Sequence, residues 1–276
     1  MPTVPTDTLT TVVCSYSVDP LRLRRALRRI GERIGVALGG VVVCNGPHDL
    51  PASDCDWKFI RGSNAELDFS AYREGSEYLQ RADRQARSVL FLNDSTFTKH
   101  NAFRMIQALL AYQPALEGSE LPAIAGKTDA YDNVCYANPW SRLPVYVSSF
   151  CFLLNANALD ALPEVRRQAD ADLGSPAVDL SSPDWGANLT APFRTYLRTH
   201  LGHSGTSISW YQLAQHVGNA ELLAKKARCV YSEHRLSGEI GQKGIVFAVY
   251  PQLRMKARFF LFEQAAKVAR RLRLSA

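Results

Sequence analysis

The feature that most constrains the fold is an alternation between short apolar runs and stretches with helical periodicity. Six runs rich in β-branched, aliphatic or aromatic residues occur in the first 155 residues, at 10–14, 41–44, 57–60, 88–92, 123–126 and 145–154. Such runs predict buried strands. Apolar strands separated by helices are typical of a parallel sheet covered on both faces. The sequence therefore predicts an α/β, Rossmann-like fold with a mostly parallel sheet.

The helices between these runs have recognisable starts and apolar faces. Asp19 followed by Pro20 is typical of an N-cap and a first helical position. Apolar residues follow at spacings of four, three and four, from Leu23 to Ile34, with arginines on the other positions. Further helices are predicted over 68–84 and around Phe103, Ile106 and Leu110.

The charge is unevenly distributed along the chain. The 32 basic and 26 acidic residues give a net charge of +6. Residues 252–276 contain seven basic residues and one acid, so residues 1–251 contain 25 of each. A neutral body argues against a basic nucleic-acid-binding face. We therefore expect a catalytic or binding domain over 1–251, a separate basic segment over 252–276 and no nucleic-acid partner.

The basic segment has the pattern of an amphipathic helix. Apolar residues including Phe259, Leu261 and Phe262 fall on adjacent rows, and Lys256, Lys267, Arg270 and Arg271 cluster opposite them. Aromatic residues on the apolar face and basic residues on the other are typical of an interfacial helix on an anionic membrane. The alternative is a helix that docks on the core or on a second subunit.

The sequence also favours a reduced, cytoplasmic compartment. The first ten residues lack the charged start and apolar core of a signal peptide. No apolar stretch approaches the roughly 18 residues of a membrane span. The six cysteines are scattered, and Cys14, Cys44 and Cys151 lie in apolar runs, where cysteine is usually a small buried hydrophobe. We expect a cytoplasmic protein held peripherally at the inner face of the plasma membrane.

Polar residues follow the predicted strands at the edge where ligands bind in parallel sheets. They are Ser15 and Tyr16, Asn45, Arg61 and Asn64, and Asn93, Asp94 and Ser95. The plainer interpretation of the Asn45-Gly46 and Asn93–Ser95 segments is a turn or a helix cap. Asp68 has the same alternative as a cap of the helix that it opens, and Arg61 as a solvated charge.

Several segments in this order resemble a known group of enzymes. TVVCSYSVDPLRLRRAL at 11–27, with VVVCNG at 41–46, resembles the first βαβ unit of family-2-like glycosyltransferases of the GT-A fold. NAELDFSAYREG at 64–75 is similar to the N-x-x-x-DF-x-x-[WY]-x-x-G segment of rhamnan-synthesis-F-type proteins. LNDS at 92–95, IAGKTD at 124–129 and SSFCFLLN at 148–155 resemble their later blocks. The resemblance covers residues 10–160.

This resemblance implies a site for a nucleotide-sugar donor and a divalent metal. In GT-A enzymes an acidic motif at a strand end holds Mg²⁺ or Mn²⁺ against the donor diphosphate, where the metal acts as a Lewis acid. Here Asn93-Asp94-Ser95 replaces the usual Asp-x-Asp and leaves one carboxylate. Asp94 is the expected metal or donor contact, and His234 is the expected late histidine ligand. If no metal binds, Arg235 or Lys243, in a predicted late loop, would supply the positive charge.

Sugar transfer with inversion also needs a general base for the acceptor hydroxyl. Asp184 is the first candidate and Asp179 the second, because both follow the 148–155 segment. Both lie at the end of a long loop predicted for the Pro-, Ser- and Asp-rich segment 162–184. Trp185 would suit a sugar face, although a surface turn is an equally simple interpretation. At Asn188 the resemblance leads us to expect a glutamate, which asparagine cannot replace as a base.

The leading expectation is a glycosyltransferase that moves a sugar from dTDP-rhamnose or a UDP-sugar to a lipid-linked, bacterial cell-surface glycan. The alternative is a non-catalytic module with a degenerate transferase fold that binds a glycan or an assembly partner at the membrane. The missing second acid of the metal motif favours the alternative.

Overall fold

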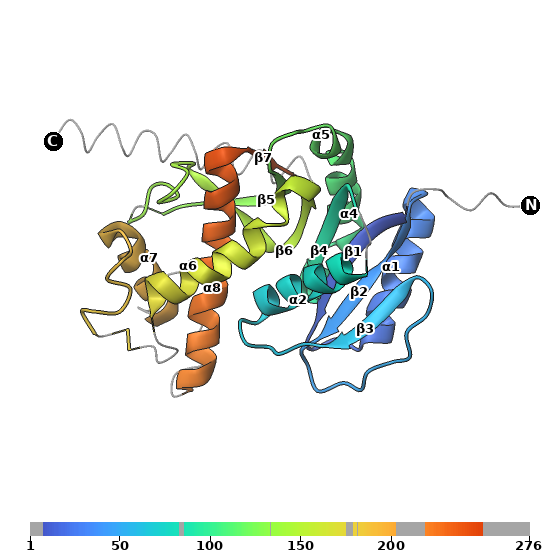
Figure 1. The fold of residues 1–276 in the computed structure, drawn as a ribbon, viewed down its shortest axis with the longest axis horizontal. Helices are drawn as coiled ribbons and strands as arrows, with labels where there is room; N and C mark the ends of the chain where they lie inside the picture. The colour runs from blue at the N-terminus through green and yellow to red at the C-terminus, as the bar shows by residue number, and fades with distance from the viewer. Residues whose placement is uncertain are drawn as a thin grey trace, which may run out of the picture.

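The fold is an α/β layered structure, seen in a computed structural model that describes residues 8–82, 86–132, 134–174, 179–180, 182–202 and 219–250 (Figure 1). The described strands are β1 (Thr8–Ser15), β2 (Ala37–Cys44), β3 (Trp57–Arg61), β4 (Ser88–Asn93), β5 (Ala123–Ala130), β6 (Val145–Asn155) and β7 (Ile245–Ala248). The described α-helices are α1 (Pro20–Ile34), α2 (Asp68–Arg81), α3 (Ser95–Thr98), α4 (Ala102–Leu110), α5 (Gln113–Glu117), α6 (Ala161–Leu173), α7 (Ala191–Gly202) and α8 (Ala220–Lys243).

The strands form one seven-stranded sheet in the order β3-β2-β1-β4-β6-β5-β7. Strands β1 to β4 pair in parallel, and β6 pairs antiparallel with both β4 and β5. The prediction of a mostly parallel α/β sheet is confirmed. The chain passes from β1 through β2 to β3 in one direction and then returns to place β4 on the other side of β1. The gap between the ends of β1 and β4 is therefore the topological switch point of the sheet.

One face of the sheet is covered by α1, α4 and α5. Leu23, Leu27 and Ile30 of α1 are buried in the same apolar cluster as Ile106 of α4 and Leu116 of α5. The predicted N-cap of α1 is confirmed, because the Asp19 carboxylate accepts a hydrogen bond from the Arg22 backbone N–H at 2.9 Å. The spacing of apolar residues thus turns this arginine-rich helix so that its charges face outward.

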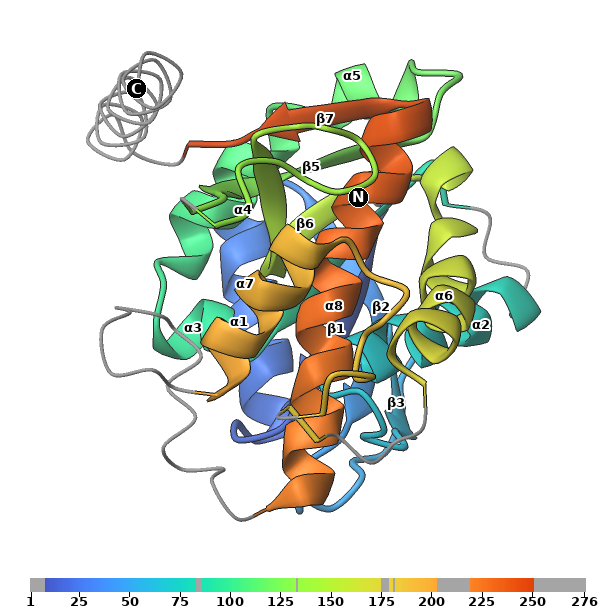
Figure 2. The ribbon, with the colours of Figure 1, turned by 90° about the vertical axis from the view of Figure 1, so that its left-hand side faces the viewer.

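The other face is covered by α2, α6 and α8 (Figure 2). Helix α2 approaches the sheet closely at Gly75, where a Cβ atom would lie 2.4 Å from Cγ1 of Val12. Tyr72, one turn earlier, is fully buried and its ring meets Phe91 and Phe152 edge-on. This packing sets the N-terminus of α2, and with it Asp68, over the ends of β1 and β4.

A third cluster lies between α7, α8 and the segment after β5. It is rich in aromatic residues, including Tyr131, Tyr146, Phe193, Tyr196 and Tyr231. Because α7 and α8 contribute to it together, this cluster forms a smaller core beside the main sheet.

Two expectations about the second half of the chain are wrong. Segment 162–184 is not one long loop, since α6 occupies Ala161–Leu173 and buries Leu162, Val165, Ala169 and Leu173. These residues are spaced three, four and four apart, which is a helical stripe. Arg235 and Lys243 do not lie in a loop either, because both belong to the 24-residue helix α8.

The predicted C-terminal helix over 252–276 lies outside the described residues, so the division of the chain at residue 251 stays a prediction. Among the described helices, none is both long enough and apolar enough to cross a membrane. The expectation that Cys14, Cys44 and Cys151 are buried, unpaired thiols is confirmed.

Candidate functional site

At the switch point of the sheet, the carboxylate of Asp94 binds the loop that follows β1. Its Oδ2 accepts hydrogen bonds from the backbone N–H groups of Tyr16, Ser17 and Val18 at 3.0, 2.6 and 3.1 Å. It also accepts one from the Ser17 hydroxyl at 2.9 Å. Three successive N–H groups around one oxygen form an anion-binding concavity, which Asp94 itself fills. Asp94 therefore holds the loop after β1 against the end of β4.

The residues on either side of Asp94 organise the same strand end. Asn93 donates from Nδ2 to Oδ2 of Asp68 at 2.6 Å, and its Oδ1 accepts from the backbone N–H of Ser95 at 3.1 Å. Asp68 lies in the first turn of α2, as expected, but its side chain contacts β4 and does not cap the helix. Burial raises the pKa of Asp68, while the hydrogen bond from Asn93 and the charge of Lys226 oppose that rise.

Two asparagine oxygens at this edge are buried with no donor among the described residues. They are Oδ1 of Asn45, after β2, and Oδ1 of Asn64, after β3. The Asn45 amide donates to the Leu67 carbonyl at 3.0 Å, which fixes the side chain. Asn64 and Leu67 have φ angles of +52° and +53°, a sparsely populated conformation for such residues. Strained backbone and unsatisfied acceptors are features that concentrate at ligand sites.

The other predicted residues of this edge divide into supporting and exposed groups. Arg61 donates to the carbonyls of Gly46 and His48 at 2.8 and 2.7 Å, so it is neither a freely solvated charge nor an open anion contact. Ser15 is buried and donates to the Val18 carbonyl at 2.7 Å. Tyr16 is 49% exposed and presents its ring at the rim.

Helix α8 adds a residue to this edge that the sequence analysis missed. Lys226 lies close enough to Asp68 for its charge to lower the pKa of that carboxyl. Cys229, one turn later, is buried in the same cluster as Cys14 and Phe69. The sequence gives no signal for this approach, because it depends on how α8 crosses the sheet.

A second polar cluster lies at the end of β5 and the start of β6. Lys127 pairs with Oδ1 of Asp129 at 2.5 Å, and the Ser148 hydroxyl donates to the other oxygen of the same carboxylate. The His100 ring stacks on Phe150 with centroids 3.9 Å apart, and its pKa is lowered by burial and then by Lys127. Since β5 runs parallel to β4, Asp129 lies toward the same edge of the sheet as Asp94. This cluster was not singled out from the sequence, although Lys127 and Asp129, directly after the apolar run 123–126, could have indicated it.

The two candidate general bases lie on the segment between α6 and α7. Asp179 and Asp184 are exposed, and Asp184 belongs to a turn in which its carbonyl accepts from the Ala187 N–H. Trp185 is 6% exposed and packs beneath Arg198, so its ring does not present an open face to a sugar. Hydrogen bonds from Arg194 and Arg198 to backbone carbonyls join this turn to α7.

The expected pairing of Asp94 with His234 at a metal is not formed. His234 is fully buried among the rings of Tyr131, Tyr146 and Tyr196, and its Nδ1 lies 2.9 Å from the Tyr131 hydroxyl. Burial holds its pKa well below the ordinary value. The rings around it offer no carboxylate. His234 lies on the side of α8 that faces this aromatic core, which is why it does not reach Asp94.

Arg235 is also occupied elsewhere. It pairs with Glu239 one turn along α8, and its guanidinium lies 4.5 Å from the centre of the Trp140 ring. Its described neighbours include Glu239 of α8, Trp140 before β6 and Glu164 of α6, whose pKa the charge of Arg235 helps to lower. The structure gives Arg235 a packing role and does not bring it to the strand ends.

The described residues contain one group of three side chains with metal-ligating atoms close together, Asp54, Cys55 and Asp56. This group precedes β3 and lies at the opposite edge of the sheet from Asp94. The Asp54 carboxylate already accepts from two backbone N–H groups and pairs with Arg24 at 2.6 Å. Three ligands are therefore not gathered around Asp94 by the part of the chain that the structure describes.

No family model matches the chain, and no curated protein matches it.

Proposed function

We propose that the chain is a glycosyltransferase of the GT-A fold that uses a nucleotide-sugar donor, dTDP-rhamnose or a UDP-sugar. The observation that carries this proposal is the organised switch point, where Asp94 joins the β1 loop to β4 and two buried asparagine oxygens lack donors. Crevices at such points are where α/β sheets bind nucleotides. Asn64 and Asp94 lie in segments that resemble rhamnan-synthesis-F-type proteins, and Asn45 lies in the segment that resembles family-2-like glycosyltransferases.

Each residue of this edge has a role that its contacts support. The exposed Tyr16 ring would stack on the base, and the buried Oδ1 atoms of Asn45 and Asn64 would accept hydrogen bonds from the base or ribose once these side chains turn outward. Asp94, Asn93 and Arg61 are positioning residues, since their hydrogen bonds hold the loops that carry the contacts. The donor diphosphate would lie beyond the β1 loop.

A divalent cation fits this edge only together with the donor. Oδ2 of Asp94 is occupied by four hydrogen bonds, and the described residues around it do not complete a ligand set. A bound Mg²⁺ or Mn²⁺ would take its other oxygens from the diphosphate and would neutralise the leaving group. The chain's own contribution at this point is the position of the loop over residues 16–18.

The acceptor hydroxyl needs a base, for which Asp184, and next Asp179, are proposed. The reaction would then be a direct displacement with inversion, in which the carboxylate takes the hydroxyl proton as the oxygen attacks the anomeric carbon. The acceptor would be a bacterial cell-surface glycan on a lipid, and the enzyme would work in the cytoplasm at the membrane. Residues 252–276 would supply the membrane contact.

A second candidate function has one observation in its favour. Segment 93–95 contains one carboxylate, that of Asp94, where GT-A enzymes have two. This carboxylate accepts hydrogen bonds from the Ser17 backbone and hydroxyl, so it is already used within the protein. A non-catalytic module that binds a glycan or partner would have no need of a complete metal site.

Calorimetric titration with UDP and with dTDP, each with and without Mn²⁺, tests the proposed function. We expect one of the two nucleotides to bind. Asp94→Asn removes charge from the oxygen that holds the β1 loop, so affinity should fall by about tenfold or more. Asp184→Asn changes the same chemical group in an exposed turn and should leave nucleotide affinity unchanged while reducing transfer. If neither nucleotide binds under any condition, the enzyme proposal fails and the binding module remains.

A further inference from the structure

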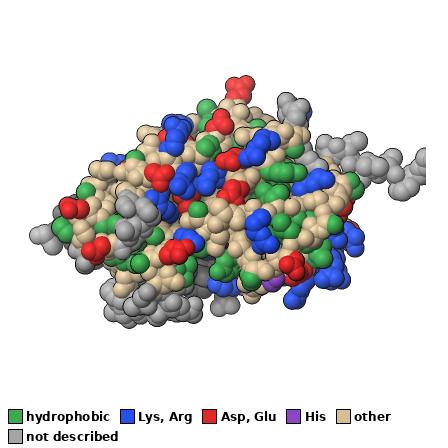
Figure 3. Space-filling view, turned by 60° about the horizontal axis from the view of Figure 1, so that its bottom comes forward, with side chains coloured by type: hydrophobic (Ala, Val, Ile, Leu, Met, Phe, Trp, Pro, Cys, Tyr) green, Lys and Arg blue, Asp and Glu red, His purple; other side chains and the backbone are tan. Residues whose placement is uncertain are grey.

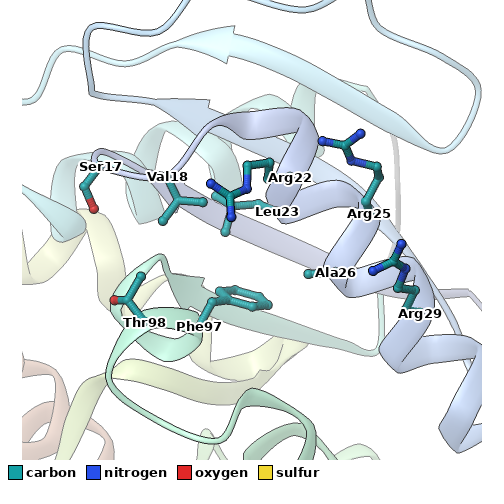
Figure 4. A pocket seen from close by; sticks show the side chains of 9 residues that line it. All are labelled: Ser17, Val18, Arg22, Leu23, Arg25, Ala26, Arg29, Phe97 and Thr98. Carbon is teal, nitrogen blue, oxygen red and sulfur yellow. The ribbon is translucent and has the colours of Figure 1, made fainter.

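A groove with an arginine wall lies between α1 and α3, next to the loop that Asp94 holds. It encloses about 510 Å³ and is lined by Arg22, Arg25 and Arg29 of α1 on one side and by Phe97 and Thr98 of α3 on the other (Figure 4). Ser17, whose backbone N–H is bound by Asp94, lies at one end. The groove therefore adjoins the switch point of the sheet from the face that α1 covers.

The three arginines form one charged row. Their spacing of three and four residues places them on one side of α1, along about 10 Å of the helix axis. All three are exposed, and among the described residues none of their guanidinium groups has an ion-pair or hydrogen-bond partner. The nearby acid Asp19 is engaged in capping the helix. Lys and Arg side chains also gather at the lower right in Figure 3, the side on which α1 lies.

The other arginines of α1 are engaged with neighbours. Arg24 pairs with Asp54, Arg28 with Glu32, and Arg33 lies over the Phe103 ring. The absence of a described partner for the row at 22, 25 and 29 is thus specific to the side chains that line the groove. Unneutralised guanidinium groups along a concave surface attract and bind phosphate groups through paired N–H donors.

The floor of the groove has a different character. Val18, Ala26 and Phe97 are partly buried, and Leu23 beneath them is buried in the main core. In Figure 4 the Phe97 ring and Ala26 lie near one another, with the guanidinium groups of Arg22 and Arg25 above them and that of Arg29 to the right. An inorganic anion would use the arginines and leave this apolar floor uncovered. A ligand with both an anionic head and an apolar chain matches both parts.

We propose that this groove binds a phosphate or diphosphate ester carried on an apolar chain, with the phosphates on the arginine row and the start of the chain against Phe97. The ligand class is that of an amphiphilic, lipid-linked phosphate. In the context of the proposed function, on which this assignment as acceptor rests, the groove holds the charged end of the lipid that carries the growing glycan. The shared loop over residues 16–18 couples the groove to the donor edge.

The test uses soluble probes that separate the two parts of the ligand. Farnesyl diphosphate carries both, inorganic pyrophosphate carries the charge alone, and farnesol carries the chain alone. With the full-length protein, we expect farnesyl diphosphate to bind more tightly than either of the others and to weaken with added salt. Replacing the row with Arg22→Gln, Arg25→Gln and Arg29→Gln should weaken its binding by about tenfold or more.

A matched control removes the same charge elsewhere. Arg28, Arg81 and Arg167 are also exposed, and each is paired only with a glutamate one turn away on its own helix among the described residues. The triple change of these residues to Gln should leave farnesyl diphosphate affinity unchanged. Equal losses in both triple variants would mean that binding follows net charge, which would overturn the groove assignment.

Two further measurements test whether the phosphate belongs to a bilayer lipid and whether the groove and the proposed transferase function stand independently. Vesicles of phosphatidylcholine with phosphatidic acid present the same chemistry in a bilayer, and the groove variant should bind them less well than the control variant. UDP and dTDP affinities should be the same in both triple variants. Farnesyl diphosphate binding without nucleotide binding would uphold the groove and overturn the transferase. Nucleotide binding with no preference for farnesyl diphosphate over pyrophosphate would overturn the groove alone.

Discussion

At the residue scale, the ends of the predicted strands indicate where site residues lie but not what each side chain contacts. Asn45, Asn64 and Asp94 were expected at one edge because parallel strands end together, and Asp68 was expected there from the resemblance of segment 64–75. In the structure Asp68 contacts Asn93 at the end of β4. Their individual roles were less predictable. Whether a carboxylate faces solvent or a backbone N–H depends on loop geometry, which a sequence pattern does not encode.

His234 shows the limit of motif position as evidence. A late histidine in roughly the expected place was assigned to a metal, yet it is buried in an aromatic cluster. Position along the chain does not specify which side of a helix a residue occupies, and here the apolar side included the histidine. The same reasoning applies to Arg235, the next residue of α8.

The burial of His234 predicts a pH dependence of stability. Its pKa in the folded protein lies well below the value of about 6.5 in an unfolded chain. The unfolded state therefore binds a proton first as pH falls, so stability is retained above about pH 6.5 and lost below it. The slope for one such group approaches about 1.4 kcal/mol per pH unit. Urea denaturation between pH 7.5 and pH 5.5 measures it.

His234→Phe should remove this contribution while keeping a ring in the cluster. The free energy of unfolding of the variant should then fall less steeply over that pH range than that of the wild type. His100, whose pKa is also lowered, is present in both proteins and cancels in the comparison. Identical slopes would show that His234 does not titrate differently in the folded and unfolded states.

At the scale of elements, the first half of the chain was predictable and the second half was not. The strands before residue 155 are apolar runs with clear boundaries, and each was located within a few residues. Helices α6 and α8 were missed because their apolar positions are small or interrupted, as at Ala169, Ala224 and Ala227. Charged residues between such positions resemble loop composition unless the helical period is sought.

Helices α2, α6 and α8 meet at one buried carboxylate, Glu66, just before α2. It is 1% exposed and pairs with Arg73 at 2.8 Å and with Arg166 at 2.7 Å. Arg228 of α8 lies 4.0 Å away. Three cations around one acid leave a strong imbalance if the acid is neutralised. Glu66 therefore holds together the three helices that cover one face of the sheet beside the candidate site.

Glu66→Gln should lower the free energy of unfolding by about 3 kcal/mol, because it removes the buried negative charge that Arg73 and Arg166 share. Their remaining partners, Glu77 and Asp170, are 44% and 49% exposed and compensate only in part. Glu77→Gln is the matched control, since Glu77 is 44% exposed and pairs with Arg73 and Arg81 on the same helix. It should cost less than about 1 kcal/mol. Chemical denaturation of the two variants under one condition checks the difference, and similar losses would argue against the linking role of Glu66.

At the scale of the whole molecule, the uneven charge predicts that nucleotide binding and membrane binding belong to different parts of the chain. The neutral body over 1–251 contains the strand-end site, and the excess of positive charge lies in 252–276. Deleting 252–276 should reduce binding to anionic vesicles, because several basic residues near such a surface each contribute about 1 kcal/mol. Nucleotide affinity should be unchanged. A vesicle sedimentation assay of the two proteins checks this, and full vesicle binding by the shortened chain would contradict it.

The position of β7 has a consequence for folding during synthesis. Ile245 of β7 pairs with Ala123 of β5, so β5 is the edge strand of the sheet until all of α8 and then β7 have been synthesised. An uncovered edge strand can recruit strands from other chains. Until β7 forms, the eight residues of β5 are available for such pairing. β7 then becomes the edge strand, and its four residues present a shorter edge to other chains.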